Sequence, residues 1–134
     1  MGNKEKQLLL IMSNKEKQLL LIDLCARLPY GVKTSNGNGI LKLSPRTDVI
    51  YIVDNGYIPY LRPMSSMTMD EIKYKLSKFF KIINTNIEGI GYIPTLNSGS
   101  AIEYINWLNE NMFDYRGLIE KGLALEAPEG MYND

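Results

Sequence analysis

Residues 3–28 read NKEKQLLLIMSNKEKQLLLIDLCARL, and the nine residues NKEKQLLLI stand in this stretch twice, at Asn3–Ile11 and at Asn14–Ile22. The stretch contains neither glycine nor proline, and most of its residues favour a helix. A period of eleven residues is three helical turns, so both copies would show the same face of one long N-terminal helix. Its apolar clusters are too dense for a single stripe. We therefore expect this helix to be covered on more than one side, or to pair with a second copy of the protein.

The repeat also bears on where the domain begins. Two copies are too few for a solenoid, which needs at least three repeats to bury a continuous core. We interpret residues 1–11 as a duplicated or artificially added leader and Met12 as the natural start. Residues 12–134 are then expected to form a single domain, as the length of 134 residues suggests.

A first β-hairpin is expected after Pro29 ends the helix. Val32–Thr34 and Ile40–Leu43 are the two strands, and they flank the sequence SNGNG at residues 35–39. Asn-Gly pairs suit the positive φ angles of a tight turn, so this segment is typical of a hairpin loop.

A second hairpin is predicted around Asn55-Gly56. Val49–Val53 is β-branched and aromatic throughout, which makes it the strongest predicted strand of the chain. The turn leads into Tyr57–Leu61, where Pro59 indicates an edge strand or the end of a strand.

Two capping boxes predict two further helices. Thr68 with Glu71 opens the first, and Ser100 with Glu103 opens the second, which runs to about Asn111. Apolar residues recur at helical spacing in both, so each helix is expected to bury one side. These residues are Ile72, Leu76, Phe79, Phe80 and Ile83 in the first helix and Ile102, Ile105, Trp107 and Leu108 in the second.

The remaining segments complete the expected fold. Asn84–Ser98 is predicted to be a loop with a short strand at Gly91–Ile93, and Leu123–Asp134 a tail. Asp114 is expected to cap a short C-terminal helix, Tyr115–Lys121. The predicted class is α+β: a long N-terminal helix, a small antiparallel sheet of three or four strands with hairpin turns, two further helices and a short C-terminal helix.

The composition excludes several classes of function. The chain has no histidine, so a histidine base, a histidine-dependent nucleophile or a histidine-ligated zinc cannot form within it. Its formal net charge is zero, which argues against a nucleic-acid partner. The longest apolar runs have four or five residues, against about 20 for a membrane span. Neither a membrane partner nor a cofactor or metal site is expected.

Cys25 is the single cysteine of the chain. An intramolecular disulfide is therefore impossible, and a reduced, cytoplasmic setting is expected. We expect Cys25 to behave as a small buried hydrophobic residue.

The connection Tyr60–Thr68, YLRPMSSMT, is the strongest ligand candidate. Hydroxyls, an arginine and free helix N–H groups meet there, as a phosphate or carboxylate would require. The alternative is a plain strand-to-helix connection whose serines bond their own backbone.

Asp114-Tyr115-Arg116 is a second candidate anion site, and its alternative is that Asp114 caps a helix while Arg116 pairs with Glu120. The candidate ligand-binding residues are Arg27, Tyr30, Tyr60, Arg62, Ser65, Ser66 and Arg116.

Three segments carry a resemblance to known proteins: DLCARLPYGVK at Asp23–Lys33, PYLRPMSSMT at Pro59–Thr68 and WLNENMFDYRGLIEKGLALEAPEGMY at Trp107–Tyr132. With them the chain resembles a family of small uncharacterised proteins from gut Bacteroidales and their phages and prophages. Relatives often carry histidines just before FDYRGL, where this chain has Asn111 and Met112. The resemblance therefore implies a bacterial or phage setting, and the missing histidines favour binding over catalysis.

Two functions are expected from these observations. The first is a non-enzymatic accessory protein of a phage or mobile element in the cytoplasm of a bacterial host. It would bind a host factor or sequester a small anionic, nucleotide-like ligand, in a counter-defence role and as a homo-oligomer. The alternative is a small carboxylate- or metal-dependent hydrolase or nuclease, which would need Asp48, Asp54 or Glu103 to converge.

Overall fold

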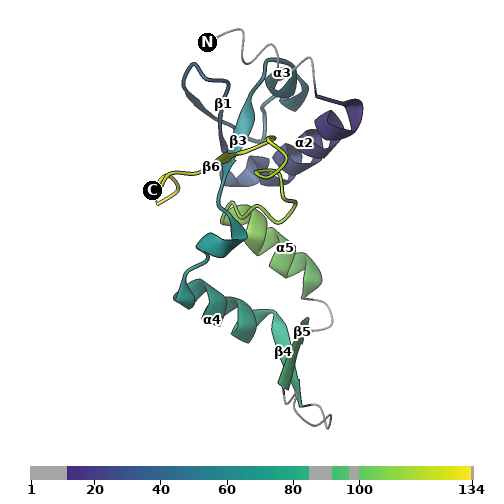
Figure 1. Ribbon diagram of the computed structural model, residues 1–134, viewed down its shortest axis with the longest axis vertical. Helices are drawn as coiled ribbons and strands as arrows, with labels where there is room; N and C mark the ends of the chain where they lie inside the picture. The colour runs from purple at the N-terminus through teal and green to yellow at the C-terminus, as the bar shows by residue number, and fades with distance from the viewer. Residues whose placement is uncertain (1–11, 85–91, 97–99, 134) are drawn as a thin grey trace.

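The long N-terminal helix, α2 (Asn14–Arg27), begins at the second copy of the repeat (Figure 1). The computed structural model describes residues 12–84, 92–96 and 100–133. Ser13 has an extended backbone and caps α2, because its Oγ accepts a hydrogen bond from the Glu16 N–H at 3.1 Å and Glu16 Oε1 accepts one from the Ser13 N–H. The prediction of one helix running through both copies is therefore wrong at Ser13, and the first copy lies outside the described residues.

A mixed four-stranded sheet packs beside α2, with the strand order β2-β1-β3-β6. The strands are β1 (Lys33–Ser35), β2 (Ile40–Lys42), β3 (Ile58–Leu61) and β6 (Leu125–Glu126). The first hairpin is confirmed, with β1 antiparallel to both β2 and β3.

The prediction of a purely antiparallel sheet is wrong at β6, which runs parallel to β3. The segment predicted as a C-terminal tail thus supplies an edge strand. β6 pairs with Tyr60 and Leu61 and leaves Pro59 with β1 as its strand neighbour. β3 is an inner strand, so the alternative of an edge strand is wrong, whereas the alternative of a strand end fits, because Pro59 lies near the start of β3, before the residues that pair with β6.

The predicted strand Val49–Val53 is a helix, α3 (Val49–Asp54). Asp48 caps it by accepting a hydrogen bond from a backbone N–H of the first turn. Val49, Ile52 and Val53 are buried, and they share one face at helical spacing. A short apolar run can form either a strand or a buried helix, and here the cap and the packing of this face on α2 decide for the helix.

An arm of two helices and a hairpin extends away from the sheet (Figure 1). Its elements are the short 3-10 helix η2 (Met64–Ser66), α4 (Met69–Lys78), β4 (Phe80–Asn84), β5 (Tyr92–Leu96) and α5 (Ala101–Glu110). The capping box of Thr68 with Glu71 is confirmed at the start of α4. At Ser100 the predicted box is wrong, because its backbone is already helical and its side chain makes no capping hydrogen bond.

The predicted apolar faces of the arm helices are only partly correct. α4 ends at Lys78, so Phe80 and Ile83, which were predicted in the helix, lie in β4. Phe80 pairs with Leu96 of β5, which lies in the segment that was predicted as a loop with a short strand. Ile102 of α5 is 74 % exposed. Aromatic rings hold α4 against α5 instead, with centroids 5.4 to 5.8 Å apart for neighbouring pairs. The rings are those of Tyr74, Phe79, Tyr104 and Trp107.

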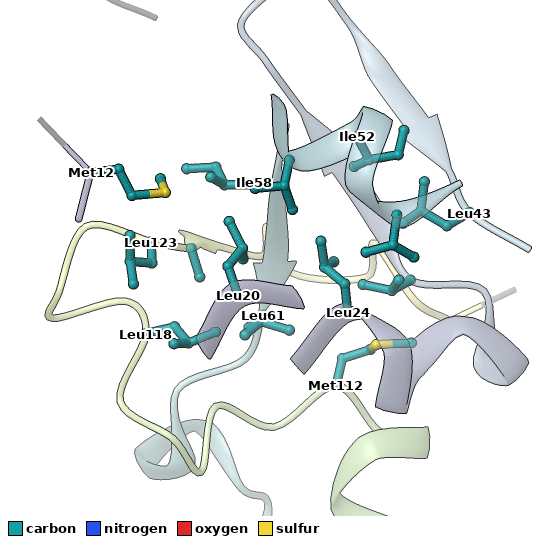
Figure 2. Close-up of a cluster of buried hydrophobic side chains, with 14 residues drawn as sticks. Met12, Leu20, Leu24, Leu43, Ile52, Ile58, Leu61, Met112, Leu118 and Leu123 are labelled. Carbon is teal, nitrogen blue, oxygen red and sulfur yellow. The ribbon is translucent and has the colours of Figure 1, made fainter. Parts of the chain in front are cut away.

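The main core lies between α2, α3, the sheet and the C-terminal segment (Figure 2). Leu20 and Leu24 of α2 are fully buried at its centre. Leu118 and Leu123 close it from the C-terminal side. Cys25, by contrast, is exposed on α2, so the prediction that it is buried is wrong.

The expected short C-terminal helix does not form, and Tyr115–Lys121 is a series of turns. The Asp114 carboxylate accepts hydrogen bonds from the N–H groups of Leu118 at 2.8 Å and Ile119 at 3.0 Å. Asp114 thus caps a turn in the way it was expected to cap a helix. The α+β class itself is confirmed.

Candidate functional site

The candidate site is built around Phe113, which follows α5 in an extended stretch. Arg62 and Phe113 form a parallel bridge: the Arg62 N–H donates to the Met112 carbonyl at 2.7 Å, and the Asp114 N–H donates to the Arg62 carbonyl at 2.8 Å. Two arginines from distant parts of the chain contact Phe113, one at its carbonyl and one at its ring. Each of these arginines is paired with a carboxylate.

The first pair, Arg27 with Asp23, is fully buried on α2. Arg27 donates from Nε and Nη2 to the two Asp23 carboxylate oxygens at 2.9 and 3.0 Å, and from Nη2 to the Phe113 carbonyl at 2.7 Å. Arg116 adds a second cation, with its Nε 3.4 Å from Asp23 Oδ1. The Tyr115 ring lies beside both guanidinium groups. This cluster fastens α2 to the segment after α5.

The second pair, Arg62 with Glu71, is partly exposed, with side-chain exposures of 24 % and 21 %. Arg62 donates from Nη1 and Nη2 to the two Glu71 oxygens at 2.9 and 2.7 Å. Its guanidinium lies over the Phe113 ring at 4.2 Å. The hydrogen bonds from Arg62, opposed by partial burial and assisted by the Thr68 N–H, lower the pKa of Glu71 to about 2. Arg62 is therefore held rigidly, and both oxygens of its partner are occupied.

A cleft of about 570 Å³ lies beside the Arg62–Glu71 pair. Three parts of the chain line it: the connection from Arg62 to Glu71, the C-terminal end of α5 at Glu110 and Asn111, and the segment 126–133. Its volume falls within the range of about 300–1,000 Å³ that is common for ligand sites.

The lining of the cleft is acidic. One arginine, Arg62, and four glutamates line it. Glu71 forms an ion pair with Arg62. The other three, Glu110, Glu126 and Glu129, are exposed and form no ion pair with a described residue. The cleft therefore favours cations over anions.

Tyr132 fixes the C-terminal wall of the cleft to the sheet. Its hydroxyl accepts a hydrogen bond from the Lys33 N–H at 2.9 Å and donates one to the Tyr60 carbonyl at 2.8 Å. Burial raises the pKa of Tyr132 to about 12, so the hydroxyl keeps its proton near neutral pH. The Ala127 N–H also donates to the Leu61 carbonyl at 2.8 Å, which continues the pairing of β6 with β3.

The structure separates the seven predicted ligand-binding residues. Arg62 and Ser66 line the cleft. Ser65 is exposed and does not line it, and Tyr60 contributes its carbonyl to the Tyr132 hydroxyl. Ser66 Oγ donates to the Pro63 carbonyl at 2.7 Å, so the alternative in which a serine bonds its own connection is confirmed for it.

The other three predicted residues lie apart from the cleft lining. Arg27 is fully buried against Asp23 and has no surface to offer a ligand. Arg116 meets Asp23 rather than Glu120, its predicted partner. Tyr30 ends the 3-10 helix η1 (Leu28–Tyr30) and is 37 % exposed.

The sequence reasoning missed the acidic side of the cleft. Glu126 and Glu129 stand in the stretch EAPEG, which was predicted as a tail, and Glu110 ends α5. Two glutamates flanking Ala127-Pro128 in the tail were the available signal. Its meaning depends on the parallel pairing of β6, which no local pattern predicts.

Acidic side chains do not gather elsewhere into a metal site. Among residues 12–84, 92–96 and 100–133, no three acidic or cysteine side chains are placed to hold a metal ion together. In the same part of the chain, no helix combines the length and the apolar character that crossing a bilayer requires.

None of the protein-family models, curated proteins and solved structures compared with the chain matches it. The resemblance to proteins of gut Bacteroidales and their phages therefore stays a prediction. The three segments that carry it do meet in space, since Arg27, Arg62 and Phe113 come from one segment each and both arginines contact Phe113.

Proposed function

We propose that the chain is a non-enzymatic accessory protein that binds a partner protein in the cleft beside Arg62 and Glu71. The observation that carries this proposal is the charge of the cleft, which is lined by four glutamates and by one arginine that is already paired with Glu71. Its walls are rigid, because the Arg62–Glu71 pair and the Tyr132 hydroxyl tie them to the sheet and to Phe113. A preformed surface of this kind limits the entropy cost of binding.

A partner protein suits this cleft better than the small anionic ligand that the sequence also suggested. An anion would need a free cation or free N–H donors. Arg62 gives two hydrogen bonds to Glu71, and the Glu71 side chain also accepts the N–H of Thr68 at the start of α4. The three remaining glutamates would repel a nucleotide phosphate.

The resemblance to proteins of gut Bacteroidales and their phages provides a setting for this proposal. In that setting the partner is a host factor and the role is counter-defence in the cytoplasm of the bacterial host. We extend the proposal to self-association, because Ile22 of α2 and Ile50 and Tyr51 of α3 are each about 60 % exposed. Light scattering at high micromolar concentration tests this part, and a monomer would contradict it.

The experiment for the cleft compares two alanine-to-tryptophan variants. Ala127→Trp fills the cleft, whereas Ala101→Trp adds the same side chain to an exposed position at the start of α5, outside the cleft lining. Each variant is checked for folding by circular dichroism and then used as bait in a host lysate with quantitative mass spectrometry.

We expect a partner that the wild type and Ala101→Trp retain and Ala127→Trp loses. Equal capture by all three would place the binding surface elsewhere. Turnover of a phosphodiester or nucleotide substrate by the purified protein would contradict the non-enzymatic part of the proposal.

A further inference from the structure

We propose that the partner enters the cleft with a basic segment, whose lysine or arginine side chains meet Glu110, Glu126 and Glu129 along the cleft walls. This inference rests on the proposed function and names the chemistry of the partner. It makes the cleft a site for a cationic peptide.

The first argument is the balance of charge inside the cleft. Both terminal nitrogens of Arg62 donate hydrogen bonds to Glu71, so the guanidinium does not neutralise the other carboxylates. Glu126 and Glu129 come from the C-terminal wall and Glu110 from the end of α5. Carboxylates supplied by two walls around a hollow of about 570 Å³ favour a cation placed between them.

The second argument is the direction of α5. The helix runs from Ala101 to Glu110, so its C-terminal end, with the negative end of its dipole, meets the cleft at Glu110 and Asn111. The carbonyls of Trp107, Leu108 and Asn109 already accept backbone hydrogen bonds, so a nearby cation is favoured by the helix dipole alone. The backbone and the side chains of this wall therefore favour the same sign of ligand charge.

The third argument concerns the uncharged part of the lining. Pro63, Ala127, Pro128 and Met131 present apolar surface between the carboxylates. Lysine and arginine carry an aliphatic stem beneath their charge and lie well on such surfaces. A chain segment with basic side chains uses both parts of the lining, whereas a small polyamine lacks a backbone to fill the remaining volume. We therefore assign the site to a peptide.

The test measures binding of two synthetic probes to the full chain by fluorescence anisotropy. The first probe is a labelled heptapeptide, Gly-Lys-Gly-Arg-Gly-Lys-Gly, and the second has glutamate at each charged position. The double variant Glu126→Gln with Glu129→Gln removes two cleft carboxylates. Glu103→Gln with Glu120→Gln is the matched control, because both residues are exposed and neither lines the cleft.

We expect the basic probe to bind the wild type and the control alike, the cleft variant to bind it at least tenfold more weakly, and the acidic probe not to bind. Affinity should fall with added salt. No binding of the basic probe, or equal weakening in both double variants, would overturn the inference. Spermidine competing as well as the unlabelled heptapeptide would overturn the assignment to a peptide.

The outcome separates this inference from the proposed function. If the basic probe fails while Ala127→Trp still loses a partner from the lysate, the cleft binds protein by other chemistry and only the inference falls. If Ala127→Trp loses no partner, the proposed function falls, whatever the probe does.

Discussion

The two arginine–carboxylate pairs contact the same residue, Phe113, yet they stand in opposite environments. Arg27 and Asp23 have no exposed surface, whereas Arg62 and Glu71 keep about a fifth to a quarter of theirs. The buried pair joins α2 to the segment after α5, and the partly exposed pair lines the cleft. Similar hydrogen-bonding groups thus join two parts of the fold in one region and shape the wall of a cleft in the other.

Burial decides how much each pair matters for stability. Loss of one partner from a buried ion pair leaves an unpaired charge in the protein interior, at a cost of about 3–5 kcal/mol. Exposed pairs contribute about 0.2–1 kcal/mol, because water and salt screen them. The following changes test this contrast.

The largest effect is expected from Asp23→Ala, which leaves Arg27 buried without its carboxylate. The free energy of unfolding should fall by about 3–5 kcal/mol, as measured by urea denaturation. The double variant Asp23→Leu with Arg27→Met should recover part of this loss, because it removes both charges. A single variant that loses less than about 1 kcal/mol would show that the buried pair does not secure the fold.

A smaller effect is expected when each arginine is replaced by lysine. Arg27→Lys loses the planar fork that serves Asp23 and the Phe113 carbonyl together, and it should cost about 1.5–3 kcal/mol. Arg62→Lys should cost less than about 1 kcal/mol. Chemical denaturation of both variants side by side provides the measurement. Equal costs would remove the distinction between the two pairs.

The acid limb of the stability curve should depend on Glu71. The pKa of Glu71 in the folded chain is about 2, below its ordinary value of 4.5. The ionised carboxylate therefore stabilises the folded chain fully at pH values above 4.5. This contribution is lost as the pH falls from 4.5 to 2. Glu71→Gln should therefore lower the free energy of unfolding at pH 7, where the ionised carboxylate contributes fully, and flatten the loss of stability between pH 4.5 and pH 2, as urea denaturation at a series of pH values would show. An unchanged acid limb would contradict the assignment.

The smallest effect is expected from removal of residues 1–11. Ser13 and Glu16 complete the start of α2 between them, and Met12 is the first of the described residues that belong to the core. The shortened chain should keep its free energy of unfolding within about 0.5 kcal/mol. A larger loss in thermal or urea unfolding would mean that the leader stabilises the domain.

Sequence reasoning succeeded where a structure depends on neighbouring residues. The SNGNG turn, the strand Ile58–Leu61 and the capping box at Thr68 all depend on local backbone chemistry, and all three are present. It failed at Val49–Val53, because a five-residue apolar run fits a strand or a buried helix equally well. The contact with α2 resolves this ambiguity, and it is not visible in the sequence.

The candidate site shows the same division. Arg62 and Ser66 were found because they stand together in the connection before α4. Glu110, Glu126 and Glu129 were not found, since the parallel pairing of β6 with β3 brings Glu126 and Glu129 to the cleft that Glu110 lines from the end of α5. Arg27 was expected at the surface, and nothing local indicates that Phe113 lies over it, 86 positions further along the chain.

The buried pair has a further consequence for a chain in which the sequence of the first nine residues of α2 occurs twice. If the first copy were to occupy the place of α2, Met12 would stand where Asp23 is and Glu16 where Arg27 is. Glu16 would then turn a carboxylate toward the Phe113 carbonyl, which accepts hydrogen bonds and gives none. The Asp23–Arg27 pair thus determines which copy of the nonapeptide can form α2. Only the second copy is followed by Asp23 and by Arg27, which bonds the Phe113 carbonyl.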